Sequence, residues 1–167
     1  MITIDRLDAD IIGRLSTHAR IGIAELATQL GVARNTVQSR LRRLEESGVL
    51  TGFRPVVDLE AVGVVAQAFV ALELEQRRLA EVVDALALLP QVLEITTQAG
   101  REDLLVRVAA PSHAELQHVV TQMIDTPGVR HTVTTMAVST PLPYRTQPLL
   151  ELLTRESGFG RATPASS

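Results

Sequence analysis

Three residues, spaced four and six positions apart, constrain the fold of the first third of this chain more than any other feature. Ala27 lies in an apolar pattern of helical period and is small enough to let a second helix cross closely. Gly31 interrupts that pattern where a short turn needs a positive φ angle. Val37 belongs to a further helix, which we expect to start near Ala33, and would fill the core between the two helices. Two helices joined by three or four residues that include glycine predict a helix-turn-helix.

A first helix precedes this pair, because residues 5–15 carry an apolar stripe of helical period with acids in the first turn. Ser47-Gly48 is a typical helix end and closes the third helix. Residues 49–53 and 56–58 are predicted as short strands, which would make residues 1–54 a winged helix-turn-helix domain, followed by a linker at 55–63. The alternative is an αα-hairpin within a helical bundle.

The third helix has a polar and basic face opposite its apolar stripe. Asn and Gln side chains suit adenine in the major groove, and Arg suits guanine or phosphate. We therefore predict these DNA-binding residues: Arg34, Asn35, Thr36, Gln38, Ser39, Arg40, Arg42 and Arg43. For Arg40 the competing interpretation is an ion pair with Glu25 or Glu45 inside the domain. For Arg42 and Arg43 it is an ordinary solvated surface.

Charge and composition narrow the function classes. Residues 1–54 hold eight Arg and six acids (+2), and the remainder holds eight Arg and thirteen acids (−5), which gives the net charge of −3. The basic balance lies where the helix-turn-helix does, as DNA binding requires. Cysteine is absent, which excludes disulfides, thiolate catalysis and cysteine-ligated metals. With no apolar leader and no apolar run long enough to cross a bilayer, we expect a cytoplasmic protein.

Residues 64–140 follow a β-α-β-β-α-β order. Strand patterns cover residues 66–74, 92–98, 103–109 and 129–138, and helical patterns cover 79–89 and 116–123. An internal repeat supports the order, because Leu89-Pro90-Gln91-Val92 and Thr126-Pro127-Gly128-Val129 each join a helix to a strand. The fold class is therefore α+β, with a ferredoxin-like sheet that carries both helices on one face. The bare face predicts a homodimer.

Residues 141–167 form a C-terminal extension. Its leucine-rich stretch 148–156 is expected to be a short docked helix, and the end from Gly158 is expected to be disordered.

The motifs as a set resemble the leucine-responsive/asparagine-responsive (Lrp/AsnC, or feast-or-famine) family of transcriptional regulators. The resemblance covers about residues 4–140. It rests on Ile4-Asp5, Asp8, Ile11-Ile12, Leu15, Ala19-Arg20-Ile21, Glu25-Leu26-Ala27, Gly31-Val32, Val37, Arg40-Leu41, Arg43-Leu44-Glu45, Gly48-Val49-Leu50 and Gly52-Phe53, and on the loop Gly100-Arg101-Glu102-Asp103.

The resemblance implies a dimer, often assembled further, that binds pseudo-palindromic DNA and responds to an amino acid or related small molecule. The matching effector-binding residues would be Gln98, Gly100, Arg101, Glu102 and Asp103. Backbone N–H groups of the loop would hold a carboxylate and the aspartate an ammonium group. The alternative role for the aspartate is to cap its own backbone in the turn.

The chain departs from the family pattern at three points. Gly22 and Ala33 stand where a Ser or Thr commonly caps the second and third helices, and Arg101-Glu102 stands where an aromatic residue is common. The identity of the effector is therefore left open.

Two other functions fit the same residues. Siroheme decarboxylases resemble this architecture, but the four histidines are scattered along the chain, so we expect no catalytic residue, metal site or cofactor. An architectural protein that bends DNA without responding to a ligand would use the same basic helix. Ligand titration separates this architectural function from that of a regulator that senses an effector.

Overall fold

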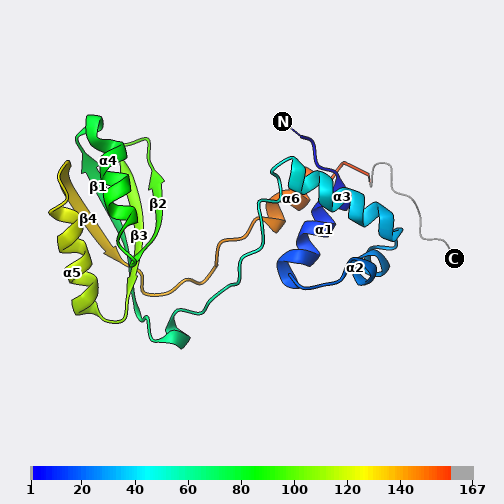
Figure 1. Cartoon of the computed structure of the whole chain (residues 1–167), viewed down its shortest axis with the longest axis horizontal. Coiled ribbons are helices and arrows are strands. Elements are labelled where there is room, and N and C mark those ends of the chain that lie inside the picture. The colour runs from blue at the N-terminus through cyan, green and yellow to red at the C-terminus, as the bar shows by residue number, and fades with distance from the viewer. Residues whose placement is uncertain (1, 159–167) are drawn as a thin grey trace. The chain divides into compact units, whose positions relative to one another are not determined.

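The computed structural model describes residues 2–158 and divides the chain into two compact units. Unit 1 comprises the described parts of Met1–Pro55 and Pro143–Ser167, and unit 2 is Val56–Leu142. Both ends of the chain thus belong to the same unit, and unit 2 is inserted between them (Figure 1). The predicted disorder from Gly158 onward falls almost entirely outside the described residues.

Unit 1 contains four helices: α1 (Arg6–Thr17), α2 (Ile23–Leu30), α3 (Arg34–Glu46) and α6 (Gln147–Leu153). α1 begins at Asp5 because the Asp5 side chain accepts a hydrogen bond from the backbone N–H of Asp8, and the Asp8 side chain accepts one from that of Asp5. Buried apolar side chains from the first three helices, among them Leu7, Leu26 and Leu44, form one core.

The turn between α2 and α3 has the geometry that the spacing predicts. Gly31 adopts a φ of +66°, and the N–H of Val32 bonds to the carbonyl of Ala27 at 3.1 Å. Ala27 and Val37 are both buried at the crossing of the two helices. Neither α2 nor α3 has a side-chain cap, because Gly22 and Ala33 occupy the cap positions.

The strands predicted at residues 49–53 and 56–58 are wrong. The structure shows no strand there; instead, residues 49–58 run without sheet pairing between α3 and unit 2. Positive φ angles at Gly48 (71°), just before the apolar run 49–53, and at Gly52 (145°), inside it, interrupt the extended backbone. Pro55 adds a position that cannot donate to a strand ladder.

Unit 2 is a four-stranded antiparallel sheet with two helices. Its elements are β1 (Ala66–Leu74), α4 (Leu79–Ala87), β2 (Val92–Thr97), β3 (Leu104–Ala110), α5 (His113–Ile124) and β4 (Val129–Met136), with 3-10 turns at Glu60–Val62 and Gln76–Arg78. The strand order is β2-β3-β1-β4. This confirms the predicted ferredoxin-like α+β fold.

Buried and more exposed residues alternate along β1, and this alternation shows which face of the sheet the helices cover. Ala68, Val70 and Leu72 are fully buried and pack with apolar residues of α4 and α5, such as Leu86 and Met123. The alternate residues of β1 are half-buried or exposed within the described chain. Both helices lie on one side of the sheet, and the opposite side has no covering element within unit 2 (Figure 1).

α6 packs against α1 within unit 1. The Nε2 of Gln147 donates to the carbonyl oxygen of Ala9 at 3.2 Å, Leu150 joins the core, and Thr154 is fully buried. The predicted terminal helix is therefore present, although it ends at Leu153. Leu150 is the leucine of α6 that joins the core, whereas Leu149, Leu152 and Leu153 remain exposed, so the predicted helix docks through only part of its leucine-rich stretch. Among residues 2–158 no helix has the length and apolar character needed to cross a membrane.

Candidate DNA interface and effector pocket

The exposed face of α3 carries most of the residues predicted to bind DNA. Arg34, Asn35, Gln38, Ser39 and Arg42 are exposed, whereas Thr36 is half-buried. The buried side of the same helix carries Val37 and Leu44. The helix is therefore rotated as its periodicity predicts, with amide, hydroxyl and guanidinium groups facing solvent.

Arg40 and Arg43 are held inside unit 1 instead. The Arg40 guanidinium lies 2.5 Å from an Asp5 carboxylate oxygen and 3.1 Å from one of Asp8, and only 12% of its side chain is exposed. Arg43 also forms an ion pair with Asp8 and keeps 41% of its side chain exposed. The charge pattern indicated Glu25 or Glu45 as the competing partner of Arg40, whereas the structure provides Asp5, the N-cap of α1, and Asp8 in the first turn of α1.

Asp8 is the centre of this cluster. Its side chain is fully buried, and it accepts hydrogen bonds from both arginines and from the backbone N–H of Asp5. Burial opposes the charge of Arg40, but hydrogen bonds and attraction from Asp5 and Asp8 outweigh it and raise the pKa of Arg40. A buried carboxylate that is satisfied in this way fixes the packing of α3 on α1, since loss of a partner leaves charge uncompensated.

The loop between β2 and β3 presents Asp103 to the end of β1. Its carboxylate accepts hydrogen bonds from the backbone N–H of Leu74 at 2.7 Å and from the Gln76 Nε2 at 3.0 Å. The backbone N–H of Asp103 donates a hydrogen bond to the carbonyl oxygen of Leu72. Its own carbonyl oxygen accepts a hydrogen bond from the backbone N–H of Gln98. Asp103 thus caps a neighbouring strand and not its own turn.

A hollow of about 220 Å³ opens beside this carboxylate. Its walls are Leu74, Gln76, Leu79, Thr97, Gln98 and Asp103. Two of the predicted effector residues therefore come together here, Gln98 and Asp103. The other three, Gly100, Arg101 and Glu102, do not line the hollow.

The sequence did not indicate the walls contributed by the end of β1, the 3-10 turn that follows it and the start of α4, namely Leu74, Gln76 and Leu79. Their proximity follows from the antiparallel pairing of β1 with β3, in which Leu72 lies opposite Leu104. That pairing carries the residues after β1 to the loop before β3. A predicted strand order combined with this register would have indicated them.

No group of three or more potential metal ligands occurs among the described residues.

Two family models match the chain. The AsnC-type helix-turn-helix domain matches residues 4–45, and the Lrp/AsnC ligand-binding domain matches residues 67–147. The transcriptional regulator AldR of Mycolicibacterium smegmatis is 32% identical over 125 residues, which are 73% of this chain and 73% of AldR. The chain belongs to the Lrp/AsnC family.

Solved structures of Lrp/AsnC proteins have the same fold. E. coli AsnC superposes with a TM-score of 0.80 at 28% identity, over 88% of this chain and all of that one. A regulator from Neisseria meningitidis, solved as a complex with L-Met, has a TM-score of 0.80 at 19% identity over 88% of this chain and 99% of its own. The latter likeness shows the fold alone.

Membership of the Lrp/AsnC family gives the chain its function class. It is a DNA-binding transcriptional regulator with a ligand-binding domain, and the helix-turn-helix match contains nearly all of α3. The match to the ligand-binding domain contains the whole hollow beside Asp103. The family comprises regulators and not enzymes, which removes the decarboxylase reading.

Proposed function

We propose that the chain acts as a homodimer that binds a pseudo-palindromic operator through α3 and that responds to an amino acid bound beside Asp103. The observation that carries the DNA part is the exposed face of α3. It displays two guanidinium groups, two amides and a hydroxyl, and α3 has no acid before Glu45.

We assign contacts with bases and contacts with phosphates to different positions along α3. Arg34 and Asn35 lie in the first turn, the part of a recognition helix that meets base edges. Gln38 follows one turn later on the same exposed face. Arg42 is exposed near the C-terminal end, where a guanidinium is suited to a phosphate of the flanking backbone.

Selection of bound fragments from random DNA, followed by gel-shift titration, tests this assignment. Arg34→Ala and Asn35→Ala are expected to relax the preference at particular base pairs, at about 1–3 kcal/mol per lost bidentate contact. The matched control is Arg20→Ala, which removes an exposed arginine outside α3. If both α3 variants keep the wild-type preference, the assignment of α3 to base readout is wrong.

The effector part rests on the chemistry of the hollow. A carboxylate has about four acceptor sites, and two of those on Asp103 are occupied by Leu74 and Gln76. The remaining sites suit an ammonium group. Leu79 and Leu74 add apolar wall, and the loop at residues 99–102, exposed up to Arg101, offers backbone N–H groups for a carboxylate. The same fold in the Neisseria regulator holds L-Met, which supports an amino acid as the ligand class.

Thermal unfolding in the presence of each amino acid at millimolar concentration tests the effector site. A ligand at 100 times its dissociation constant adds about 2.7 kcal/mol of stability, so the true effector is expected to raise the melting temperature by several degrees. Asp103→Asn keeps an oxygen for the N–H of Leu74 but loses the charge, and it is expected to abolish the shift.

Asp84→Asn is the matched control, because it removes an exposed carboxylate of α4 outside the hollow. An unchanged shift in Asp103→Asn would place the effector elsewhere. If no amino acid moves the wild-type melting temperature, the ligand-independent architectural function takes precedence.

A further inference from the structure

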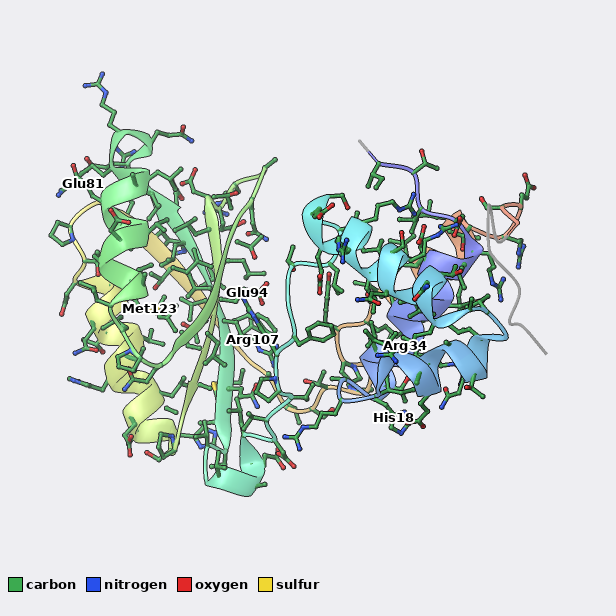
Figure 2. All side chains as sticks on the ribbon, turned by 45° about the vertical axis from the view of Figure 1, so that its right-hand side comes forward. His18, Arg34, Glu81, Glu94, Arg107 and Met123 are labelled. Atoms are coloured by element: carbon green, nitrogen blue, oxygen red, sulfur yellow. The ribbon has the colours of Figure 1, made fainter. Side chains whose placement is uncertain are left out.

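The open face of the sheet in unit 2 carries a charged residue at its centre. By strand register, Arg107 of β3 lies between Phe69 of β1 and Glu94 of β2. Figure 2 shows Glu94 and Arg107 on the side of the sheet that faces away from the helices bearing Glu81 and Met123. The same alternation places small and apolar residues (Ala71, Leu105, Ala109 and Val133) and uncharged or weakly basic polar residues (Gln67, Thr96, His131 and Thr135) on this face.

Arg107 is held by contacts within its own chain, but no carboxylate among residues 2–158 pairs with it. Its guanidinium donates to the Gln67 Oε1 at 3.1 Å and lies 5.9 Å from the centre of the Phe69 ring. Both contacts draw it over β1 and away from Glu94. Among the described residues, neither Glu94 nor Glu73, the second acid on this face, forms an ion pair. The open face therefore carries a guanidinium group and two carboxylates that do not pair with one another.

We propose that Arg107 pairs with a carboxylate of a second copy of this chain when two such faces come together, and that this pair selects a second copy as the partner. The inference rests on the proposed homodimer. In a two-fold assembly each face meets the same face, so each Arg107 meets a surface whose acids are Glu94 and Glu73.

The energetics require such a partner. Sheets that pack face to face lie about 10 Å apart, so the centre of the interface is dry. An arginine left there with a single neutral acceptor would lose much of its hydration without compensation. Phe69, which is 38% exposed, supplies apolar contact around the charge. A partner face with an arginine and no acid would be rejected, because like charges oppose each other across an interface.

Analytical ultracentrifugation of single variants is the first test. The wild-type chain is expected to be dimeric at micromolar concentration. Arg107→Glu would place a carboxylate opposite Glu94 and Glu73 of the partner and is expected to weaken the dimer at least 100-fold. Arg77→Glu makes the same charge change at an exposed residue that follows β1, and is expected to leave the dimer intact.

Mixing variants is the second test, because it distinguishes pairing between copies from pairing within one. Arg107→Glu is mixed with Glu94→Arg, and separately with Glu73→Arg, and native mass spectrometry counts the mixed dimers. One mixture is expected to form mixed dimers in excess of either variant's own dimer. Circular dichroism confirms that each variant is folded.

The outcomes are distinguishable. A wild-type chain that is monomeric at micromolar concentration overturns the proposed homodimer and the pairing with it. A wild-type dimer that Arg107→Glu leaves equally tight overturns the pairing alone. The pairing between copies is also overturned if neither mixture forms mixed dimers. Dimerisation of a chain that carries both Arg107→Glu and Glu94→Arg would not rescue it, because a pair within one chain would give the same result.

Discussion

At the scale of single residues, Arg42 and Arg43 show how much one helical step changes the role of a side chain. The directions of their side chains differ by about 100° around the axis of α3. Arg42 faces solvent, whereas Arg43 turns back to the buried carboxylate of Asp8. The same residue type thus lies on the face that we propose for DNA at one position and pairs with a buried acid at the next.

The two arginines are therefore expected to respond differently to removal. Arg42→Ala should leave stability nearly unchanged, weaken binding to all DNA sequences and reduce the salt slope of binding by about 1. Arg43→Ala should lower the free energy of unfolding of unit 1 by about 1–3 kcal/mol, because it removes a charged hydrogen bond to a buried acid. Gel-shift titrations over a range of salt and calorimetric unfolding measure the two effects. An unchanged salt slope in Arg42→Ala would contradict the phosphate contact.

The missing cap of α3 gives a second prediction at this scale. Ala33 leaves the first N–H groups of the helix without a side-chain acceptor. Ala33→Ser is expected to raise the free energy of unfolding of unit 1 by about 1 kcal/mol. Gly22→Ser at the start of α2 is the matched comparison. It should raise the free energy of unfolding by only a few tenths of a kcal/mol, since glycine is already a fair cap. Equal gains in chemical denaturation would argue against the capping explanation.

Some of these residue roles were readable from the sequence and others were not. Periodicity alone separates the exposed Gln38 from the buried Val37. The pairing of Arg40 with Asp5 and Asp8 joins positions more than 30 residues apart, and it depends on how α1 packs on α3. Charge pattern offers several acids to each arginine, and only the packing angle of the helices selects among them.

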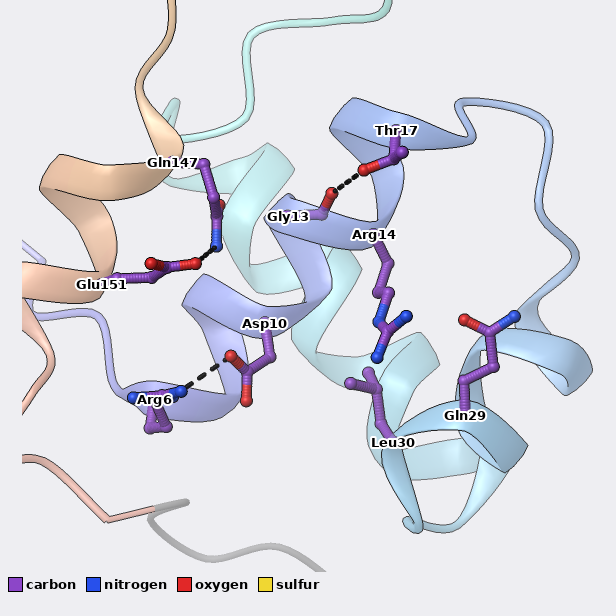
Figure 3. Close-up of a pocket in the computed structure, with 9 residues that line it drawn as sticks. All are labelled: Arg6, Asp10, Gly13, Arg14, Thr17, Gln29, Leu30, Gln147 and Glu151. Atoms are coloured by element: carbon purple, nitrogen blue, oxygen red, sulfur yellow. Dashed lines mark hydrogen bonds and ion pairs between the residues drawn. The ribbon is translucent and has the colours of Figure 1, made fainter.

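At the scale of elements, the contact between α1 and α6 depends on a glycine. A Cβ at Gly13 would lie 2.5 Å from the Gln147 Nε2, too close for both to remain. Gln147 also donates to Glu151 of its own helix, as Figure 3 shows. Gly13 thus leaves the space in which the first turn of α6 lies against α1.

A double-mutant cycle tests this contact. Gly13→Ala should gain about 1 kcal/mol of helix propensity, but in the wild-type chain the displaced Gln147 offsets that gain. In a Gln147→Ala background nothing is displaced, so the full gain of about 1 kcal/mol is expected. Chemical denaturation of the four proteins gives the coupling energy. A coupling energy near zero would show that Gln147 does not pack on Gly13.

Element prediction succeeded where the pattern was long and failed where it was short. The β-α-β-β-α-β order rests on alternation over six to nine residues per strand and on two amphipathic helices, and all six elements are present. The apolar run at residues 49–53 has comparable β-propensity, but it has no strand to pair with, and Gly48 before it and Gly52 inside it adopt positive φ angles. Propensity does not create a strand without a hydrogen-bonding partner.

At the scale of the whole molecule, the two units are joined by two chain segments, because α6 belongs with the N-terminal helices. The sequence places a domain boundary at residue 140, after the last strand, and does not indicate that the tail returns to unit 1. Leucines at helical spacing indicate an amphipathic helix, and they do not specify which surface buries it. A local motif could therefore indicate Gln98 and Asp103 beside the hollow, whereas no local motif indicates which surface the tail packs against.

Deletion of residues 147–167 is expected to destabilise unit 1 and spare unit 2. It removes the burial of Leu150 and Thr154 and the hydrogen bond from Gln147 to Ala9, which together are worth about 2 kcal/mol. For a unit of this size that loss lowers the melting temperature by roughly 8–16 °C. Calorimetry should show one transition moving and the other fixed, with the amino-acid shift of unit 2 retained. A matched deletion of only residues 159–167 leaves α6 in place and should move neither transition. If the longer deletion also leaves unit 1 unmoved, α6 contributes no stability to the DNA-binding helices, and its contact with α1 is incidental.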